Sequence, residues 1–179
     1  QLLEVARTNA VDAGLSEDQR AAALTTFSLS SWSQDGELLL SSLESAQPPV
    51  VQNAALATLL QFSDEQVARQ LLDRWPGLSP KLAERVRDGL LGRTSWAVLL
   101  LDAMTDGRLP ATTLSQSDLQ RLASVPDDAV RSRAIRLLEA MSNTTRDEVL
   151  RSYKVALTLK PDPEKGAALF KQHCSVCHQ

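Results

Sequence analysis

One helical pattern of apolar residues recurs along most of this chain, at a spacing typical of helical repeats. Each copy has four positions with the spacing i, i+4, i+5 and i+8, so that they share one side of a helix. The three full copies are Gln19, Ala23, Leu24 and Phe27; Val51, Ala55, Leu56 and Leu59; and Val130, Ala134, Ile135 and Leu138. A fourth copy has Leu82, Val86 and Leu90, with Arg87 in a slot that is otherwise apolar. This recurrence predicts a chain of stacked helices.

The central position of the pattern falls at residues 23, 55, 86 and 134. A second helix is expected after each of the first three copies, near residues 36–45, 64–74 and 95–105. The longer last step indicates an extra segment around 107–125. Small residues at the central slot let paired helices approach, while Leu and Phe fill the layer between repeats. The result resembles the helix pairs of HEAT or armadillo repeats, in an α-solenoid.

Helix-start signals support an all-α fold. Capping-box patterns are present at Ser16–Gln19 and Ser63–Gln66. Ser79–Pro80 and Asp162–Pro163 each place a capping residue before a proline suited to the first helical turn. The chain is rich in Leu and Ala and contains 7 Gly and 8 Pro, and it has no runs of β-branched or aromatic residues of the strand type. We therefore predict about ten short helices.

Composition excludes two classes of function. The net charge of −3 argues against a nucleic-acid-binding protein, which normally carries a basic face. The sequence has no apolar run of about 18 residues, so we expect no membrane span.

Because the chain begins at Gln1 in mid-pattern, we expect it to be a piece of a longer protein whose targeting sequence lies upstream.

The strongest chemical signal is a single CxxCH motif at the end of the chain, formed by Cys174, Cys177 and His178. This is the attachment signature of c-type haem, in which two cysteines form thioethers with the haem vinyl groups and the histidine ligates the iron. These two cysteines are the only ones in the chain, as expected of a dedicated attachment site. The chain stops one residue after His178, so we expect an attachment site without its pocket and no bound haem.

Two other kinds of site fit the motif less well than haem does. A zinc site needs about four ligands, and closing one from His173, Cys174, Cys177 and His178 in so short a stretch would be strained. A thioredoxin-like redox pair would open a helix after a strand, and no strand is evident nearby. Met104 and Met141 are interpreted as core filler, and neither is nominated as a haem ligand. No catalytic set of residues is visible, so we expect no enzyme activity from this chain on its own.

The residues Gly166, Leu169, Phe170, Cys174, Cys177 and His178 form the pattern GxxLFxxxCxxCH, which resembles the first helix and haem site of small class I cytochromes c. Residues 95–178 also resemble the region before CxxCH in the large haem-binding proteins of planctomycetes and verrucomicrobia. In that family a sugar-dehydrogenase-like propeller is commonly followed by HEAT-like repeats and a C-terminal cytochrome c domain. The resemblance implies that Cys174 and Cys177 attach haem c and that His178 is the axial iron ligand.

These observations predict three parts. Residues 1–142 would form a HEAT-like repeat domain, 143–161 a connecting helix and linker that restarts at Asn143, and 162–179 the opening of a truncated cytochrome c domain. The resemblance implies a parent protein that is periplasmic or otherwise exported and that transfers electrons. Its partner would be a redox protein or a dehydrogenase domain of the same parent chain. The alternative is a helical-repeat interaction module that binds no haem. In either case we expect the segment from about residue 161 onward to be loosely packed, with Phe170 not buried.

Overall fold

The computed structural model describes the backbone of residues 1–158 and 160–175, and within residues 142–148 it describes the backbone alone. All of its regular secondary structure is helical, and the described residues contain no strand. The chain divides into an N-terminal unit, Gln1–Leu138, and a C-terminal unit, Glu139–Gln179. The boundary lies inside one helix. The prediction of an all-α fold is confirmed.

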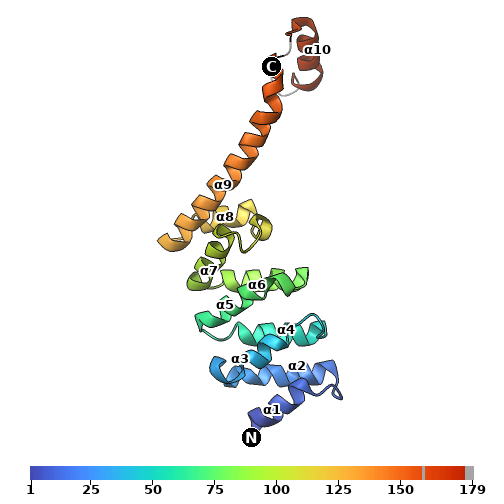
Figure 1. The fold of residues 1–179 in the computed structure, drawn as a ribbon, viewed down its shortest axis with the longest axis vertical. Coiled ribbons are helices and arrows are strands. Elements are labelled where there is room, and N and C mark those ends of the chain that lie inside the picture. Colours follow the sequence, from blue (N-terminus) through green and yellow to red (C-terminus); the bar gives the residue numbers. More distant parts are fainter. Residues whose placement is uncertain (159, 176–179) are drawn as a thin grey trace. The chain divides into compact units, whose positions relative to one another are not determined.

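The N-terminal unit stacks its helices in chain order (Figure 1). Its α-helices are α1 (Leu2–Val11), α2 (Glu17–Thr25), α3 (Trp32–Ser41), α4 (Pro49–Leu59), α5 (Glu65–Asp73), α6 (Pro80–Leu91), α7 (Thr94–Thr105), α8 (Gln116–Leu122) and the first part of α9 (Asp128–Tyr153). Short 3-10 turns follow some of them: η1 (Thr26–Leu29), η2 (Trp75–Gly77) and η3 (Ala111–Thr113).

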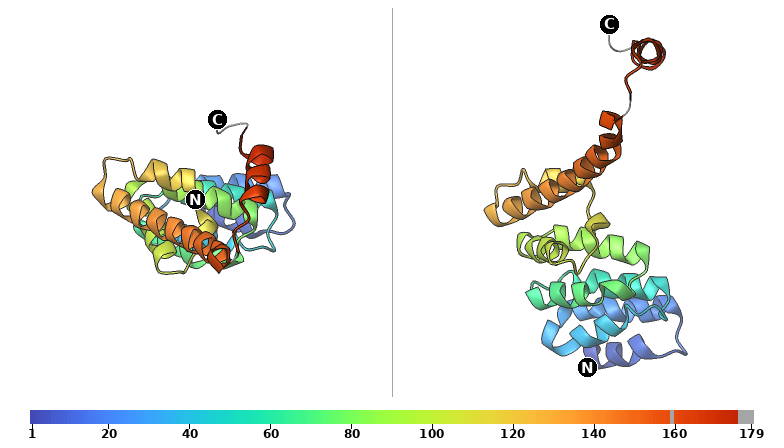
Figure 2. Two further views of the ribbon diagram at one scale, coloured as in Figure 1. Left: turned by 90° about the horizontal axis from the view of Figure 1, so that it is seen from above. Right: turned by 45° about the horizontal axis from the view of Figure 1, so that its top comes forward.

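Helices of the N-terminal unit lie in two rows. In the even row α2 packs on α4 and α4 on α6, and in the odd row α3 packs on α5 and α5 on α7. Contacts between neighbours in the chain, such as α1 with α2 and α6 with α7, join the rows. The contacts within each row thus join helices that are two apart along the chain. The right-hand view in Figure 2 shows the same layered order.

The even row is built from helix faces that repeat. The face of α4 and α6 that is turned toward the preceding even-row helix is called the near face, and the opposite one the far face; on α2 the near face is formed by the equivalent positions of the pattern. The near faces are Gln19, Ala22, Ala23 and Thr26 on α2 with its η1 turn, Val51, Ala54, Ala55 and Thr58 on α4, and Leu82, Arg85, Val86 and Gly89 on α6. All three sets have the spacing i, i+3, i+4 and i+7, which is one side of a helix.

Three contacts identify these faces. The Thr58 hydroxyl donates to the Leu24 carbonyl of α2 at 3.2 Å. The Arg85 guanidinium donates to the Asn53 side chain of α4. At Gly89, an added Cβ would lie 2.6 Å from the side chain of Leu60, so this glycine allows the end of α4 to approach α6 closely. The central residues Ala23, Ala55, Val86 and Ala134 are all buried, as predicted.

The end of the N-terminal unit differs from the predicted alignment of the pattern. Residues 130–138 were expected in the frame of α2 and α4, but they lie in α9, where Arg133 pairs with Asp102 of α7 at 2.6 Å. This contact places the start of α9 in the odd row. Leu119 of α8, which is fully buried, takes the next central position in the even row. The extra segment therefore contains the missing even-row helix.

Predicted helix starts are mostly confirmed. Ser16 forms the capping box with Gln19, and Ser79 accepts the Leu82 N–H at 3.3 Å. The start of α5 was predicted one residue early, because Asp64 rather than Ser63 caps it by accepting the Gln66 N–H at 2.8 Å. A carboxylate next to the helix start accepts this bond with a favourable charge.

The C-terminal unit contains the rest of α9, the turn η4 (Lys154–Thr158) and α10 (Pro163–His173). The predicted helix restart at Asn143 is wrong, because α9 runs without a break from Asp128 to Tyr153. Capping residues inside a helix cost little where good helix formers flank them. The connecting helix is therefore a continuation of α9.

Candidate functional site

The segment that leads into CxxCH forms a capped helix. Asp162 caps α10 by accepting the Lys165 N–H at 3.0 Å, and Pro163 occupies the first turn, as predicted. At the other end, the N–H groups of Cys174 and Ser175 both donate to the Phe170 carbonyl, at 2.8 and 3.0 Å. The helix thus ends directly before the motif. Cys174 is the C-cap residue of α10.

The predicted site residues are described only in part. Cys174 is half-buried and its thiol is free. Cys177 and His178 lie outside the described residues, so no distance joins them to Cys174. His173, at the last position of α10, is exposed. The structure therefore describes the approach to the motif and its first cysteine.

One side of α10 is apolar and uncovered. Gly166, Leu169 and Phe170 are at positions i, i+3 and i+4 of the helix, and no residue of α10 is buried. Leu169 is 48% exposed and Phe170 51% exposed. An added Cβ at Gly166 would meet no atom within 4 Å. The expectation that Phe170 is not buried is confirmed, and this side of α10 has room for another group to pack on it.

Both methionines lie in helices of the described chain. Met104 lies in α7 and is 6% exposed, in the core of the N-terminal unit. Met141 is half-buried in α9. The part of the chain that the structure describes holds no cluster of three or more His, Cys, Asp or Glu side chains able to bind a metal ion.

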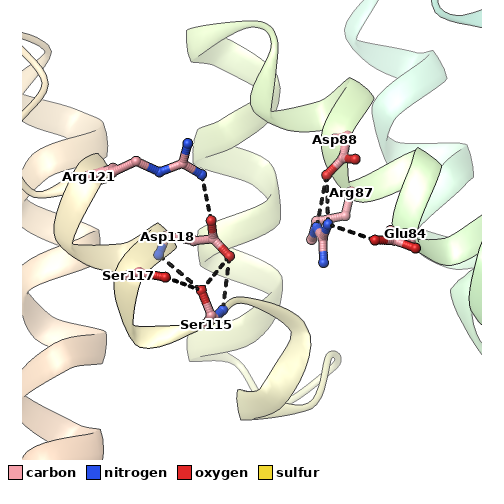
Figure 3. Close-up of polar contacts among 7 residues, drawn as sticks. All are labelled: Glu84, Arg87, Asp88, Ser115, Ser117, Asp118 and Arg121. Carbon is pink, nitrogen blue, oxygen red and sulfur yellow. Dashed lines mark hydrogen bonds and ion pairs between the residues drawn. The ribbon is translucent and has the colours of Figure 1, made fainter.

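A second polar site, not predicted from the sequence, lies between α6 and α8 (Figure 3). On the far face of α6, Arg87 pairs with Asp88 at 2.8 Å and with Glu84 at 3.7 Å. On α8, Asp118 forms a capping box with Ser115 and pairs with Arg121 at 2.5 Å. We call this group the polar seam. The positions of α2 and α4 that correspond to Arg87 are Leu24 and Leu56, and both are fully buried.

Charges in the polar seam stabilise each other's ionised forms. The hydrogen bond from Arg87 to Asp88 raises the pKa of the Arg87 guanidinium, and Asp118 adds to this through its charge. The hydrogen bond from Ser115 lowers the pKa of Asp118, with a further contribution from Arg121. Neither shift moves a group toward neutral pH, where a general acid or base works best. The seam is therefore an ion-pair network. The only sequence signal for it is Arg87 in an apolar slot.

Comparisons with protein-family models, with curated proteins and with solved structures gave no match. Among the described residues, no helix combines the length and the apolar character needed to cross a membrane.

Proposed function

We propose that this chain belongs to an exported electron-transfer protein and carries the opening segment of its c-type haem site. The observation that carries the proposal is the CxxCH motif directly after a capped α10, with Cys174 at the helix end. Short spacing between the two cysteines suits attachment to two vinyl groups of one porphyrin. The histidine that follows Cys177 would then ligate the iron.

The residues present fit a haem group. The Sγ atoms of Cys174 and Cys177 would each add across one vinyl group, and an imidazole nitrogen of His178 would bind the iron. When bound, the haem supplies one-electron redox chemistry. The protein would contribute apolar cover, for which Leu169 and Phe170 are half exposed and available. No sixth ligand is assigned.

We infer that the N-terminal unit is a HEAT-like α-solenoid that serves this protein as a spacer and docking scaffold. Polar contacts between its helices recur at sequence separations close to one repeat. Examples are Arg7 with Asp35 at a separation of 28, Arg93 with the Leu60 carbonyl at 33, and Arg133 with Asp102 at 31. Repeats that contact mainly their neighbours produce this regularity.

The compartment and the partner follow from the proposed chemistry. Covalent c-type haem is attached outside the cytoplasm, so the protein would be periplasmic or otherwise exported. Its electrons would come from a redox partner or from a dehydrogenase domain of the same parent chain. The alternative function is that of a helical-repeat interaction module that binds no haem. The regular stacking of helices in the N-terminal unit, taken without the CxxCH motif, favours this alternative.

Covalent haem distinguishes the two functions. The chain, extended by its natural flanking sequence, would be expressed in a periplasm with cytochrome c maturation, beside a Cys174→Ala/Cys177→Ala control. Electron transfer predicts a haem-sized mass increase and c-type visible absorption, both lost in the control. A folded helical protein with neither signal would leave the repeat-module function.

A further inference from the structure

A pocket in the N-terminal unit is walled by two successive connections between helices. It has a volume of about 360 Å³ and lies between the end of α3, with the loop before α4, and the turn η2 that follows α5. Leu40, Leu43 and Leu78 give it an apolar lining, and the first two are buried. All of its lining residues lie between positions 40 and 78, so helices of the same unit precede and follow it. Pockets of this size hold small molecules.

Hydrogen bonds to the main chain hold both walls of the pocket in place. On one wall, the buried side chain of Gln52 donates to the carbonyls of Leu43 and Glu44, at 3.3 and 2.8 Å. On the other wall, the N–H of Gly77 donates to the Arg74 carbonyl at 3.0 Å. Because these bonds fix the backbone before anything binds, a ligand meets a preformed pocket and little free energy is lost in ordering it.

Two opposite charges line the pocket, one from each wall. Glu44 is exposed, and within the described chain its carboxylate accepts no hydrogen bond and forms no ion pair. Arg74 is half-buried, and its guanidinium donates to the side chains of Gln70 and, at 3.4 Å, of Glu37. A guanidinium has five N–H groups, so Arg74 keeps donors for a further acceptor. No ion pair joins Arg74 to Glu44 among the described residues, so both charges remain for a ligand.

We propose that this pocket binds a free L-amino acid with an apolar side chain. Its carboxylate accepts hydrogen bonds from Arg74, its ammonium group pairs with Glu44, and its side chain packs on Leu40, Leu43 and Leu78. Hydrogen bonds between a guanidinium and a carboxylate are stronger than those between neutral groups. Removal of the apolar side chain from water contributes further to binding.

The two charges favour a zwitterion over simpler ligands. A carboxylic acid without an ammonium group would lie near the unpaired carboxylate of Glu44, which repels it. An amine without a carboxylate would displace water from Arg74 without replacing its hydrogen bonds, which is unfavourable. Residues within a peptide have lost one or both charges to amide bonds. A free amino acid carries both charges on one carbon atom and satisfies both walls.

Titration of L-phenylalanine into the isotopically labelled chain, followed by NMR, tests the proposal. We expect saturable shifts at the amides of residues 40–46 and 74–78, with a dissociation constant below about 1 mM. Three analogues should each bind at least tenfold more weakly: 3-phenylpropionate lacks the ammonium group, 2-phenylethylammonium lacks the carboxylate, and glycine lacks the apolar side chain. Binding of any analogue as tight as that of L-phenylalanine would contradict the proposed set of contacts.

Matched protein variants assign the two charges, after circular dichroism has verified that each is folded. Glu44→Gln should weaken binding at least tenfold, while Glu17→Gln, the same change at an exposed position of α2, should leave it unaltered. Arg74→Gln should also weaken binding, and Arg69→Gln on the same helix surface layer should not. Absence of saturable shifts in the folded chain, or equal binding by each variant and its control, would overturn the proposal. The inference rests on the N-terminal unit and not on haem attachment, so either can fail separately.

Discussion

Substitutions to Ala at one slot of the recurring sequence pattern should destabilise the protein by very different amounts on α2, α4 and α6. Leu24, Leu56 and Arg87 occupy the same slot of the pattern on α2, α4 and α6. Both leucines are fully buried, whereas the Arg87 side chain is 27% exposed and belongs to the polar seam. Truncation of Leu24 or Leu56 to Ala therefore removes buried apolar contacts, whereas truncation of Arg87 removes partly exposed ion pairs.

The magnitudes follow from these surroundings. A Leu→Ala change at a fully buried site costs about 2–5 kcal/mol, because it combines the lost burial with a cavity. Arg87 pairs with Asp88 and Glu84, whose side chains are 62% and 63% exposed. Ion pairs this exposed contribute about 0–1 kcal/mol. We expect Leu24→Ala and Leu56→Ala to be at least about 1 kcal/mol more destabilising than Arg87→Ala.

Urea unfolding followed by helical circular dichroism measures these differences, with the m-value compared to detect any change in cooperativity. In thermal unfolding, each 1 kcal/mol should lower Tm by about 2–4 °C for a chain of this size. An Arg87→Ala cost equal to that of Leu56→Ala would refute the reasoning. It would mean that α6 and α8 are joined as tightly as α2 and α4.

Other substitutions test local contacts. Gly36→Ala should destabilise the N-terminal unit in thermal unfolding, because the new Cβ would overlap the Trp32 ring, and a stability equal to wild type would contradict this. Gly166→Ala should stabilise α10 by up to about 1 kcal/mol, because Ala has a higher helix propensity than Gly and no atom lies within 4 Å of the new Cβ. The circular dichroism signal for helix should therefore increase. An unchanged signal would count against open space at this position. The hydrogen bond from Arg7 lowers the pKa of Asp35 in the folded protein below its ordinary value of 3.8. The ionised carboxylate therefore stabilises the fold fully at pH values above the unfolded-state pKa, and this stabilisation is lost as the pH falls through the lower pKa of the folded state. Asp35→Asn should therefore be less stable at neutral pH and lose less stability in acid, and parallel pH profiles for the two proteins would contradict this assignment.

Much of the fold follows from local sequence signals. The caps at Ser16, Ser79 and Asp162 begin helices where expected, because each signal involves residues within one helical turn. The burial of Ala23 and Ala55 follows from the helical period alone.

Contacts between residues that are far apart in the sequence could not be predicted from local patterns. Periodicity indicates which face of α9 is buried but not which helix covers it, so the pairing of Arg133 with Asp102 was missed. Residue 134 follows residue 86 by 48 positions, one and a half times the step of 32 between residues 23 and 55, and this half-step marks a change of row. Arg87 was recognised as out of pattern, yet its neighbour Asp118 could be found only in three dimensions.

The candidate site was predictable up to its first cysteine. The order of cap, proline, apolar pair and Cys174 places the motif at the end of α10, and the structure has this arrangement. Cys177 and His178 lie outside the described residues, so their roles stay predictions.

Peptide mapping tests the central claim most directly. Trypsin cleaves after Lys171, which isolates the segment that begins at Gln172 and contains both cysteines. In protein matured in a periplasm, the account predicts that this peptide carries one haem held by two thioether bonds, with no thiol left to alkylate. Recovery of the same peptide with both thiols free and alkylated, from folded protein made beside a correctly matured control cytochrome, would contradict the account.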